Sequence, residues 1–211
     1  HVGVAAELRR PAEHRVVRAG AAPDDVDDRE ADREGERGEH AGHDDRAVVP
    51  TTTRHVFVIK TDGDPAVERD YDLTAHVPAG DKIISALPDW NGLVWFASTE
   101  GKVGTLDLET GRIASTDLGE ENQNSFTVGD HNEVYIVTEK ALYRFAADAD
   151  GTPQVRWRVG YPNSGVQKPG QVSAGSGTTP TLHGDGWVSI TDNADPMNVV
   201  VYRRVTGREI C

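Results

Sequence analysis

The chain has 211 residues, and its 22 Lys and Arg against 35 Asp and Glu give a formal net charge of −13 at pH 7. This charge argues against nucleic acid or an anionic membrane surface as the main partner, because both are themselves negative. No apolar run reaches the ~18 residues of a transmembrane segment, and no signal peptide is visible. The single cysteine, Cys211, excludes an internal disulfide, so the compartment stays unknown.

The first fifty residues contain no aromatic residue, since all of these lie between Phe57 and Tyr202. They are rich in Asp, Glu and Arg, and they lack the large side chains that dominate core energetics. We therefore expect residues 1–53 to form a disordered acidic tail, whose composition also fits a GC-rich gene translated out of frame. On this interpretation residues 1–50 add nothing to the fold, and their histidines are solvated. These histidines are His1, His14, His40 and His43.

A repeat begins after this tail. Short runs of aromatic and β-branched residues at 94–98, 134–138 and 187–191 each read as a strand. Each follows a Gly- or Asn-containing turn that is itself preceded by another short strand. A third strand, a Thr-Gly or Asp-Gly turn and a fourth strand come next. The unit is therefore four antiparallel strands over about 40 residues, which is the size of a propeller blade.

The repeat predicts an all-β fold, an incomplete β-propeller made of four-stranded antiparallel blades. A β-sandwich also has short strands, but it does not require the turn to recur at the same position. Four partial blades cannot close a ring of conventional size, so we expect open blade edges that promote self-association. The expected blades lie at about 54–75, 83–118, 124–159 and 178–211, within a propeller region of 54–211.

The segment 101–112 reads Gly-Lys-Val-Gly-Thr-Leu-Asp-Leu-Glu-Thr-Gly-Arg, and residues 206–210 repeat its second half. It resembles the quinoprotein-type (PQQ-repeat-like) propeller repeat, whose consensus reads G-x-L-x-A-L-D-x-x-T-G-x-x-x-W. Family members that oxidise alcohols or sugars use pyrroloquinoline quinone (PQQ) and calcium. The resemblance therefore implies a PQQ-dependent oxidoreductase as an alternative function, and a secreted or periplasmic location if the true N-terminus is missing.

The sequence departs from this consensus at the tryptophan that locks neighbouring blades together. That residue should lie four positions after the turn glycine, where this chain has Ser115, Val155 and Cys211, although Trp157 lies two positions beyond the second. The adjacent cysteine pair that covers the quinone in some of these dehydrogenases is also missing. No cofactor-binding residue can therefore be transferred from the family to this chain.

Two insertions distinguish the last blade, thirteen extra residues within 161–177 and three within 191–198. The link into a blade's first strand and the link from its second to its third strand emerge on the same face, so both insertions belong to one face. The longer one is rich in groups that let backbone approach a ligand closely, and it would also fit an extended crossover. Its candidate ligand-binding residues are Lys168, Gly175, Ser176 and Gly177.

The shorter insertion places Asp192, Asn193, Asp195 and Asn198 together, and calcium takes such oxygen donors. Asp192 and Asp195 are the candidate metal ligands, and Asn193 joins the ligand-binding face. An Asx-rich turn whose side chains cap their own backbone is the alternative. If the insertions form a site, these residues should face Lys168 and the 175–177 backbone across one pocket mouth.

These patterns favour a propeller module that binds a small molecule, a glycan or a protein through one face. The alternatives are the PQQ-dependent oxidoreductase and a purely structural repeat. Calcium is the cofactor that the residues themselves suggest, whereas PQQ depends on the resemblance alone. Enzymatic activity is left open.

Overall fold

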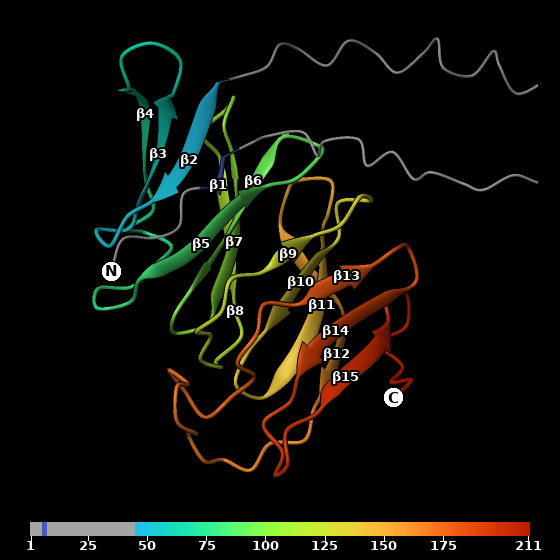
Figure 1. Ribbon diagram of the computed structural model, residues 1–211. Coiled ribbons are helices and arrows are strands. Elements are labelled where there is room, and N and C mark those ends of the chain that lie inside the picture. Colours follow the sequence, from blue (N-terminus) through green and yellow to red (C-terminus); the bar gives the residue numbers. More distant parts are fainter. Residues whose placement is uncertain (1–5, 8–44) are drawn as a thin grey trace, which may run out of the picture.

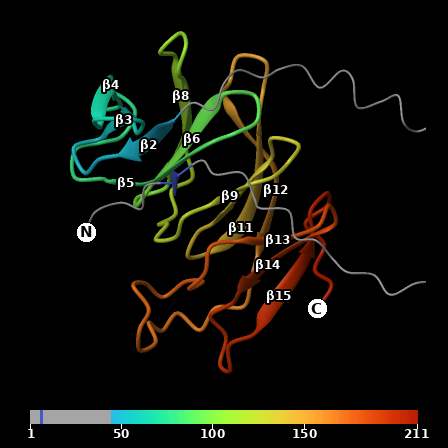
Figure 2. The ribbon, with the colours of Figure 1, turned by 45° about the horizontal axis from the view of Figure 1, so that its top comes forward.

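The computed structural model describes residues 6–7 and 45–211 (Figure 1). The described residues form fifteen β-strands in four antiparallel sheets, and none of them lies in a helix. The four sheets follow one another along the chain and lie side by side in that order (Figures 1 and 2). This arrangement confirms the predicted all-β repeat.

Three of the sheets have four strands in sequence order, and the last has three. Sheet 1 contains β1 (Ala6–Glu7), β2 (Arg46–Pro50), β3 (His55–Lys60) and β4 (Ala66–Asp72). Sheet 2 contains β5 (Ile83–Pro88), β6 (Leu93–Ser98), β7 (Lys102–Asp107) and β8 (Ile113–Asp117). Sheet 3 contains β9 (Thr127–Val128), β10 (Val134–Val137), β11 (Ala141–Ala147) and β12 (Pro153–Gly160). Sheet 4 contains β13 (Thr181–His183), β14 (Trp187–Thr191) and β15 (Val199–Arg203).

The expected fourth strand of sheet 4 is present only as backbone pairing along β15. Ile210 N–H donates to the carbonyl of Val201 at 2.8 Å, and Val201 N–H donates to that of Cys211 at 2.7 Å. The end of the chain therefore covers the outer edge of this sheet.

Consecutive sheets are joined by three hydrophobic clusters, because side chains along a strand alternate between its two faces. In β6, Val94 and Phe96 pack toward sheet 1, whereas Trp95 and Ala97 pack toward sheet 3. Each inner sheet therefore has two buried faces, which explains why the sequence of β6 reads as a continuous apolar run rather than as an alternation.

The folded region begins earlier than predicted. β2 lies inside the segment assigned to the tail, pairs with β3 through Val48 and Val58, and places Val48 in the first cluster with 7% of its surface exposed. The expectation that residues 1–50 add nothing to the fold is therefore wrong for 46–50. The short run Ala-Val-Val-Pro has no aromatic residue, which is why a search for aromatic anchors missed it. The expected disorder of 1–5 and 8–44, with all four of their histidines, lies outside the described residues.

A locking tryptophan is present despite the offset in the sequence. The N–H of the Trp157 indole donates to the Arg204 carbonyl at 2.9 Å, and its ring lies against Gly207, where an added Cβ would be only 2.8 Å away. In the pairing of β11 with β12, Arg144 faces Trp157 but Phe145 faces Val155, so Arg156 is left over as a bulge. The bulge shifts the position from which the ring reaches the next sheet.

Candidate ligand-binding face

One face of the molecule is built from the links into the first strands and from the turns between second and third strands. Three contacts join these two kinds of loop, one in each of sheets 2 to 4. Thr99 donates to Asp81 at 2.7 Å, Thr138 donates to Glu120 at 2.6 Å, and Asn163 pairs with Asn193. Both insertions therefore lie on the same face, and the longer one forms the orange loops at the lower left of Figure 1.

Asn193 fastens the long insertion to the short one. Its side chain is fully buried, and Nδ2 donates to Asn163 Oδ1 at 2.9 Å, to the Ala174 carbonyl at 2.8 Å and to the Val166 carbonyl at 3.1 Å. The Oδ1 atom accepts a bond from Gln171 at 3.3 Å. A buried amide with this many partners fixes the shape of both loops.

The structure brings the other predicted residues of the long insertion into the same assembly. Lys168 Nζ donates to the carbonyl of Ala194 in the short insertion. Gly175 passes so close to Glu139 that an added Cβ would lie 2.6 Å from its Cα, which explains the glycine. Ser176 is buried, and its carbonyl accepts a bond from Asn124 Nδ2 at 2.8 Å, whereas Gly177 is exposed. These contacts hold the loop, and a role in binding a ligand stays a prediction.

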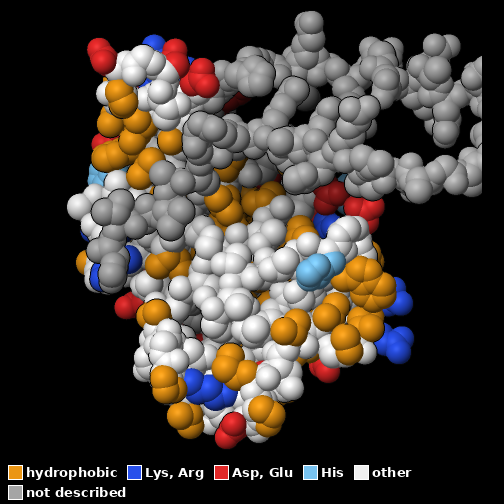
Figure 3. Space-filling model, in the orientation of Figure 1, with side chains coloured by type: hydrophobic (Ala, Val, Ile, Leu, Met, Phe, Trp, Pro, Cys, Tyr) orange, Lys and Arg blue, Asp and Glu red, His pale blue; other side chains and the backbone are white. Residues whose placement is uncertain are grey.

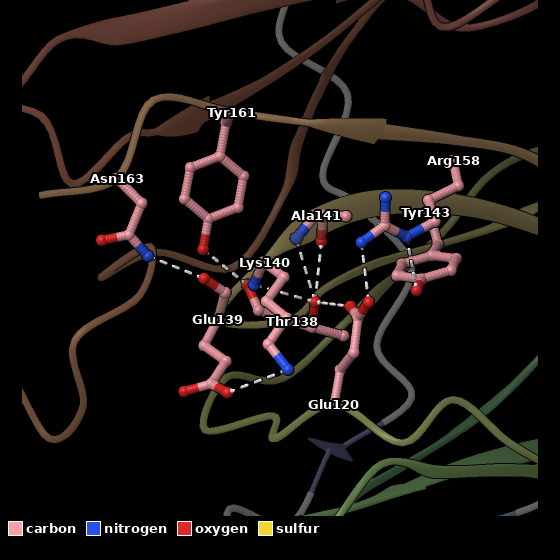
Figure 4. Close-up of polar contacts among 9 residues, drawn as sticks. All are labelled: Glu120, Thr138, Glu139, Lys140, Ala141, Tyr143, Arg158, Tyr161 and Asn163. Atoms are coloured by element: carbon pink, nitrogen blue, oxygen red, sulfur yellow. Dashed lines mark hydrogen bonds and ion pairs between the residues drawn. The ribbon is translucent and has the colours of Figure 1, made fainter. Parts of the chain in front are cut away.

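Tyr161 and Asn163 attach the start of the long insertion to the turn that follows β10 (Figure 4). The Tyr161 hydroxyl donates to the Thr138 carbonyl at 2.6 Å and accepts the Ser176 N–H at 2.8 Å. Burial raises the pKa of Tyr161 to about 12, so the phenol keeps the proton that it donates. Asn163 Nδ2 donates to the Glu139 carbonyl at 2.8 Å.

Glu120 is a nearly buried carboxylate on this face that the sequence gave no reason to select. Its Oε2 accepts a bond from Thr138, and its Oε1 accepts one from Arg158 at 2.7 Å, which in turn donates to the Tyr143 hydroxyl (Figure 4). Burial alone would raise the pKa of Glu120, but the bonds from Thr138 and Arg158 outweigh it and hold the pKa below its usual value. Its neighbour Glu121 made the pair look like an ordinary solvated loop.

Asp192 caps its own turn. Its Oδ1 accepts the N–H groups of Ala194 at 3.2 Å and Asn198 at 2.7 Å, and its Oδ2 accepts Asn198 Nδ2 at 3.0 Å. Burial would raise the pKa of Asp192, but these bonds hold it below its usual value. Ser98 and Thr138 accept N–H bonds in the same place after β6 and β10. This is the geometry of the Asx-turn alternative.

The calcium hypothesis stays a prediction. Asp195, the second candidate ligand, is exposed, and the region 45–211 places no three His, Cys, Asp or Glu side chains so that they could share a cation. A calcium ion at Asp192 would have to compete with the three hydrogen bonds that its carboxylate already accepts.

A hollow of about 100 Å³ opens between the long insertion and the link that precedes β9. Its lining is neutral and comes from Gln123, Asn124, Gly170, Gln171, Val172, Ser173, Ser176 and Gly177. Three apolar side chains of the two insertions are exposed on the same loops, namely Val166 at 60%, Val172 at 77% and Met197 at 41%. A second hollow of about 440 Å³ lies between the inner strands of sheets 2 and 3, and Leu87, Trp90, Phe126 and Val128 give it a mainly apolar lining.

Solved structures of similar shape are β-propellers. BamB from Moraxella catarrhalis matches with a TM-score of 0.59 and 16% identity, over 79% of this chain and 45% of its own. The WD40 domain of Toxoplasma gondii coronin matches with the same score and identity, over 79% and 44%. A quinohemoprotein alcohol dehydrogenase from Pseudomonas putida matches at 0.54 and 15% identity, over 80% and 32%. The chain therefore has a β-propeller fold, and it spans less than half of each of these proteins.

The sequence comparisons do not assign a family. No family model matches, so the resemblance to the quinoprotein-type repeat is supported only at the level of fold. An uncharacterized protein of Archaeoglobus fulgidus is 31% identical over 137 residues, which is 61% of this chain and 27% of that protein. In the described part of the chain, no helix is long and apolar enough to cross a membrane.

Proposed function

We propose that this chain is a propeller module that binds a protein partner through the face built by residues 161–177 and 192–198. The observation that carries the proposal is the exposure of Val166, Val172 and Met197 on loops that the buried Asn193 holds rigid. Exposed apolar side chains on a rigid scaffold bind with little loss of conformational entropy.

The dimensions of the face favour a protein over a small molecule. Small-molecule pockets usually enclose about 300–1,000 Å³, whereas the hollow beside Val172 has about 100 Å³. It has room for one side chain of a partner, and its amide and hydroxyl groups suit a neutral polar one. Apolar contacts flanked by polar groups are the usual composition of a protein interface.

The alternative functions receive less support. A PQQ-dependent oxidoreductase has only the fold in its favour, since the match to the quinohemoprotein alcohol dehydrogenase is 15% identical. A glycan would usually need aromatic platforms and hydrogen-bonding groups together, and the lining of the hollow has no aromatic residue. Both alternatives are outcomes of the tests below.

Site-specific crosslinking tests the proposed face. A photoreactive residue at position 172 or 197 should form an adduct with one partner, whereas the same residue at Val155, which is 47% exposed on β12, should not. The substitutions Val172→Ser and Met197→Ser should then weaken binding of that partner by about tenfold together. Equal labelling from position 155, or no adduct from 172 and 197, would contradict the proposal. Glycan binding, or dye reduction with PQQ and calcium, that the two substitutions abolish would replace the protein with that ligand.

A further inference from the structure

The four turns between third and fourth strands differ in whether another sheet covers them. Each contains a glycine with positive φ, and these are Gly63, Gly111, Gly151 and Gly207. A side chain from the preceding sheet lies over three of them, namely Tyr71 over Gly111, Arg112 over Gly151 and Trp157 over Gly207. At Gly63 an added Cβ would have no described atom within 4 Å. The turn of sheet 1 therefore lacks the cover that the other three turns have.

The far face of sheet 4 is the matching open surface at the other end. Val188, Ile190, Val200 and Tyr202 pack toward sheet 3, so the alternating residues of the same strands point away from it. Among these, Trp187 is 37% exposed and Val199 is 63% exposed. The corresponding face of sheet 1 includes the pair Ile59 and Val67, of which Val67 is 54% exposed. In Figure 3 hydrophobic side chains gather over both of these end sheets.

Charge distinguishes the two ends in a complementary way. Arg112 follows the Thr-Gly turn of sheet 2, and its guanidinium lies beside Gly151 in a turn that also carries Asp148 and Asp150. Arg208 follows the Thr-Gly turn of sheet 4 in the same way, is exposed, and forms no ion pair with a described residue. The uncovered turn of sheet 1 reads Asp62-Gly63-Asp64. Acidic side chains crown this turn in Figure 3, and basic ones lie at the edge of sheet 4.

Asp62 and Asp64 are available for such a contact. Asp62 has one exposed ion pair, with Lys60 at 3.5 Å, and exposed pairs of this kind are worth little. Arg203, on the far face of sheet 4, is stacked at 4.9 Å over the Trp187 ring and forms no ion pair with a described residue. Both arginines of this end are therefore free to pair with acidic groups.

We infer that a second copy of this chain covers both open ends, with sheet 4 of each copy packed on sheet 1 of the other and Arg208 beside the Asp62-Gly63-Asp64 turn. The interface continues the packing already present between sheets 1 and 2, 2 and 3, and 3 and 4. The chain matches 45% and 44% of the BamB and coronin propellers, so two copies supply about the length of one ring. A head-to-tail contact made twice closes the assembly and leaves no exposed sheet face.

Sedimentation velocity or light scattering on the full chain tests the inference. The expected species is a dimer with twice the mass of one chain. Arg208→Glu should raise the dissociation constant by about tenfold, because it places like charges at the contact, and Asp62→Arg with Asp64→Arg should do the same. Combining all three substitutions in one chain should restore the wild-type constant. Arg156→Glu, an exposed arginine on the bulge of β12 away from both ends, is the matched control and should change nothing.

Three results would overturn the inference. A single-chain mass at about 100 µM, which excludes any affinity of physiological use, would show that the ends do not recognise each other. A series of species that grows with concentration would show an open head-to-tail chain in place of a closed pair. Failure of the triple variant to regain the dimer, with its circular dichroism and melting temperature unchanged, would show that Arg208 does not face this turn.

Discussion

The indole N–H of Trp157 donates to the carbonyl oxygen of Arg204 across the junction of sheets 3 and 4, at 2.9 Å. Because the ring also packs against Gly207, this residue contributes both a hydrogen bond and apolar contact. Trp157→Phe should lower the free energy of unfolding by about 1 kcal/mol, and Trp157→Ala by about 3 kcal/mol. Urea unfolding measures both. Trp90→Ala is the control, since Trp90 is 75% exposed, and a loss at Trp90 as large as at Trp157 would contradict the role given to the junction.

A buried ion pair supports the same junction. Arg204 Nη2 lies 2.5 Å from Glu133 Oε1, and the two side chains are 3% and 4% exposed. Arg204 also reaches Asp130 at 2.8 Å. Glu133→Gln should cost about 2 kcal/mol at pH 7, because it leaves the buried guanidinium with one carboxylate in place of two. Thermal unfolding measures the change, and Asp148→Asn, at an exposed turn, is the comparison.

The effect of Glu133 depends on pH in a defined direction. Burial alone would raise the pKa of Glu133, but the bonds from Arg204 and the backbone outweigh it and hold the pKa below 4.5. A carboxylate with a lowered folded-state pKa stabilises the fold above its unfolded pKa, and this stability is lost as the pH falls through the folded value. The stability difference between wild type and Glu133→Gln should therefore shrink as the pH falls below about 4.5. A difference that grew on acidification would mean that Glu133 is protonated in the folded protein.

The sequence predicted most strands but misaligned one. The repeat set Trp187 level with Val94 and Val134, whereas in the structure Val188 is their equivalent, because all three face the preceding sheet. A shift of one residue moves every side chain of a strand to the opposite face, and short apolar strands do not reveal it. Trp187 consequently lies on the open face of sheet 4, and the short insertion is one residue shorter than counted.

The candidate face was predicted in its location but not in its chemistry. Blade connectivity was enough to place 161–177 and 191–198 together, since the direction of each link follows from strand order. The partners of Asn193 were not predictable, because they lie up to thirty residues away along the chain. Glu120 was missed for the same reason, since its partners Thr138 and Arg158 become neighbours only on folding.

Asp192 separates the calcium hypothesis from the Asx turn. Asp192→Ala removes three hydrogen bonds from the 192–198 turn, and we expect it to lower the free energy of unfolding by about 1 kcal/mol. Asp195→Ala, at an exposed residue, should change it by less than about 0.5 kcal/mol. Both values should be the same in millimolar calcium and in chelator. A rise in melting temperature with calcium, removed by both substitutions, would instead establish the metal site.

Two deletions locate the true start of the folded region. Removing residues 1–44 takes away only β1 among the described strands, so cooperative unfolding and the β-sheet circular dichroism should persist. Removing residues 1–50 also takes away β2, which pairs with β3 at five positions and buries Val48 against Val56. Because burial of one such side chain is worth about 1.5–3 kcal/mol, the longer deletion should be less stable by at least about 2 kcal/mol.

A substitution within the shorter deletion controls for the effect of chain length. Val48→Asp in the chain that begins at residue 45 keeps the backbone of β2 but places an unpaired carboxylate in the first hydrophobic cluster. It should destabilise the protein about as much as removing 45–50 does. Val49→Asp, at the neighbouring position whose side chain points to the opposite face, should cost less. Equal stability of the two deletions would show that β2 adds nothing, and would restore the sequence-based boundary at residue 53.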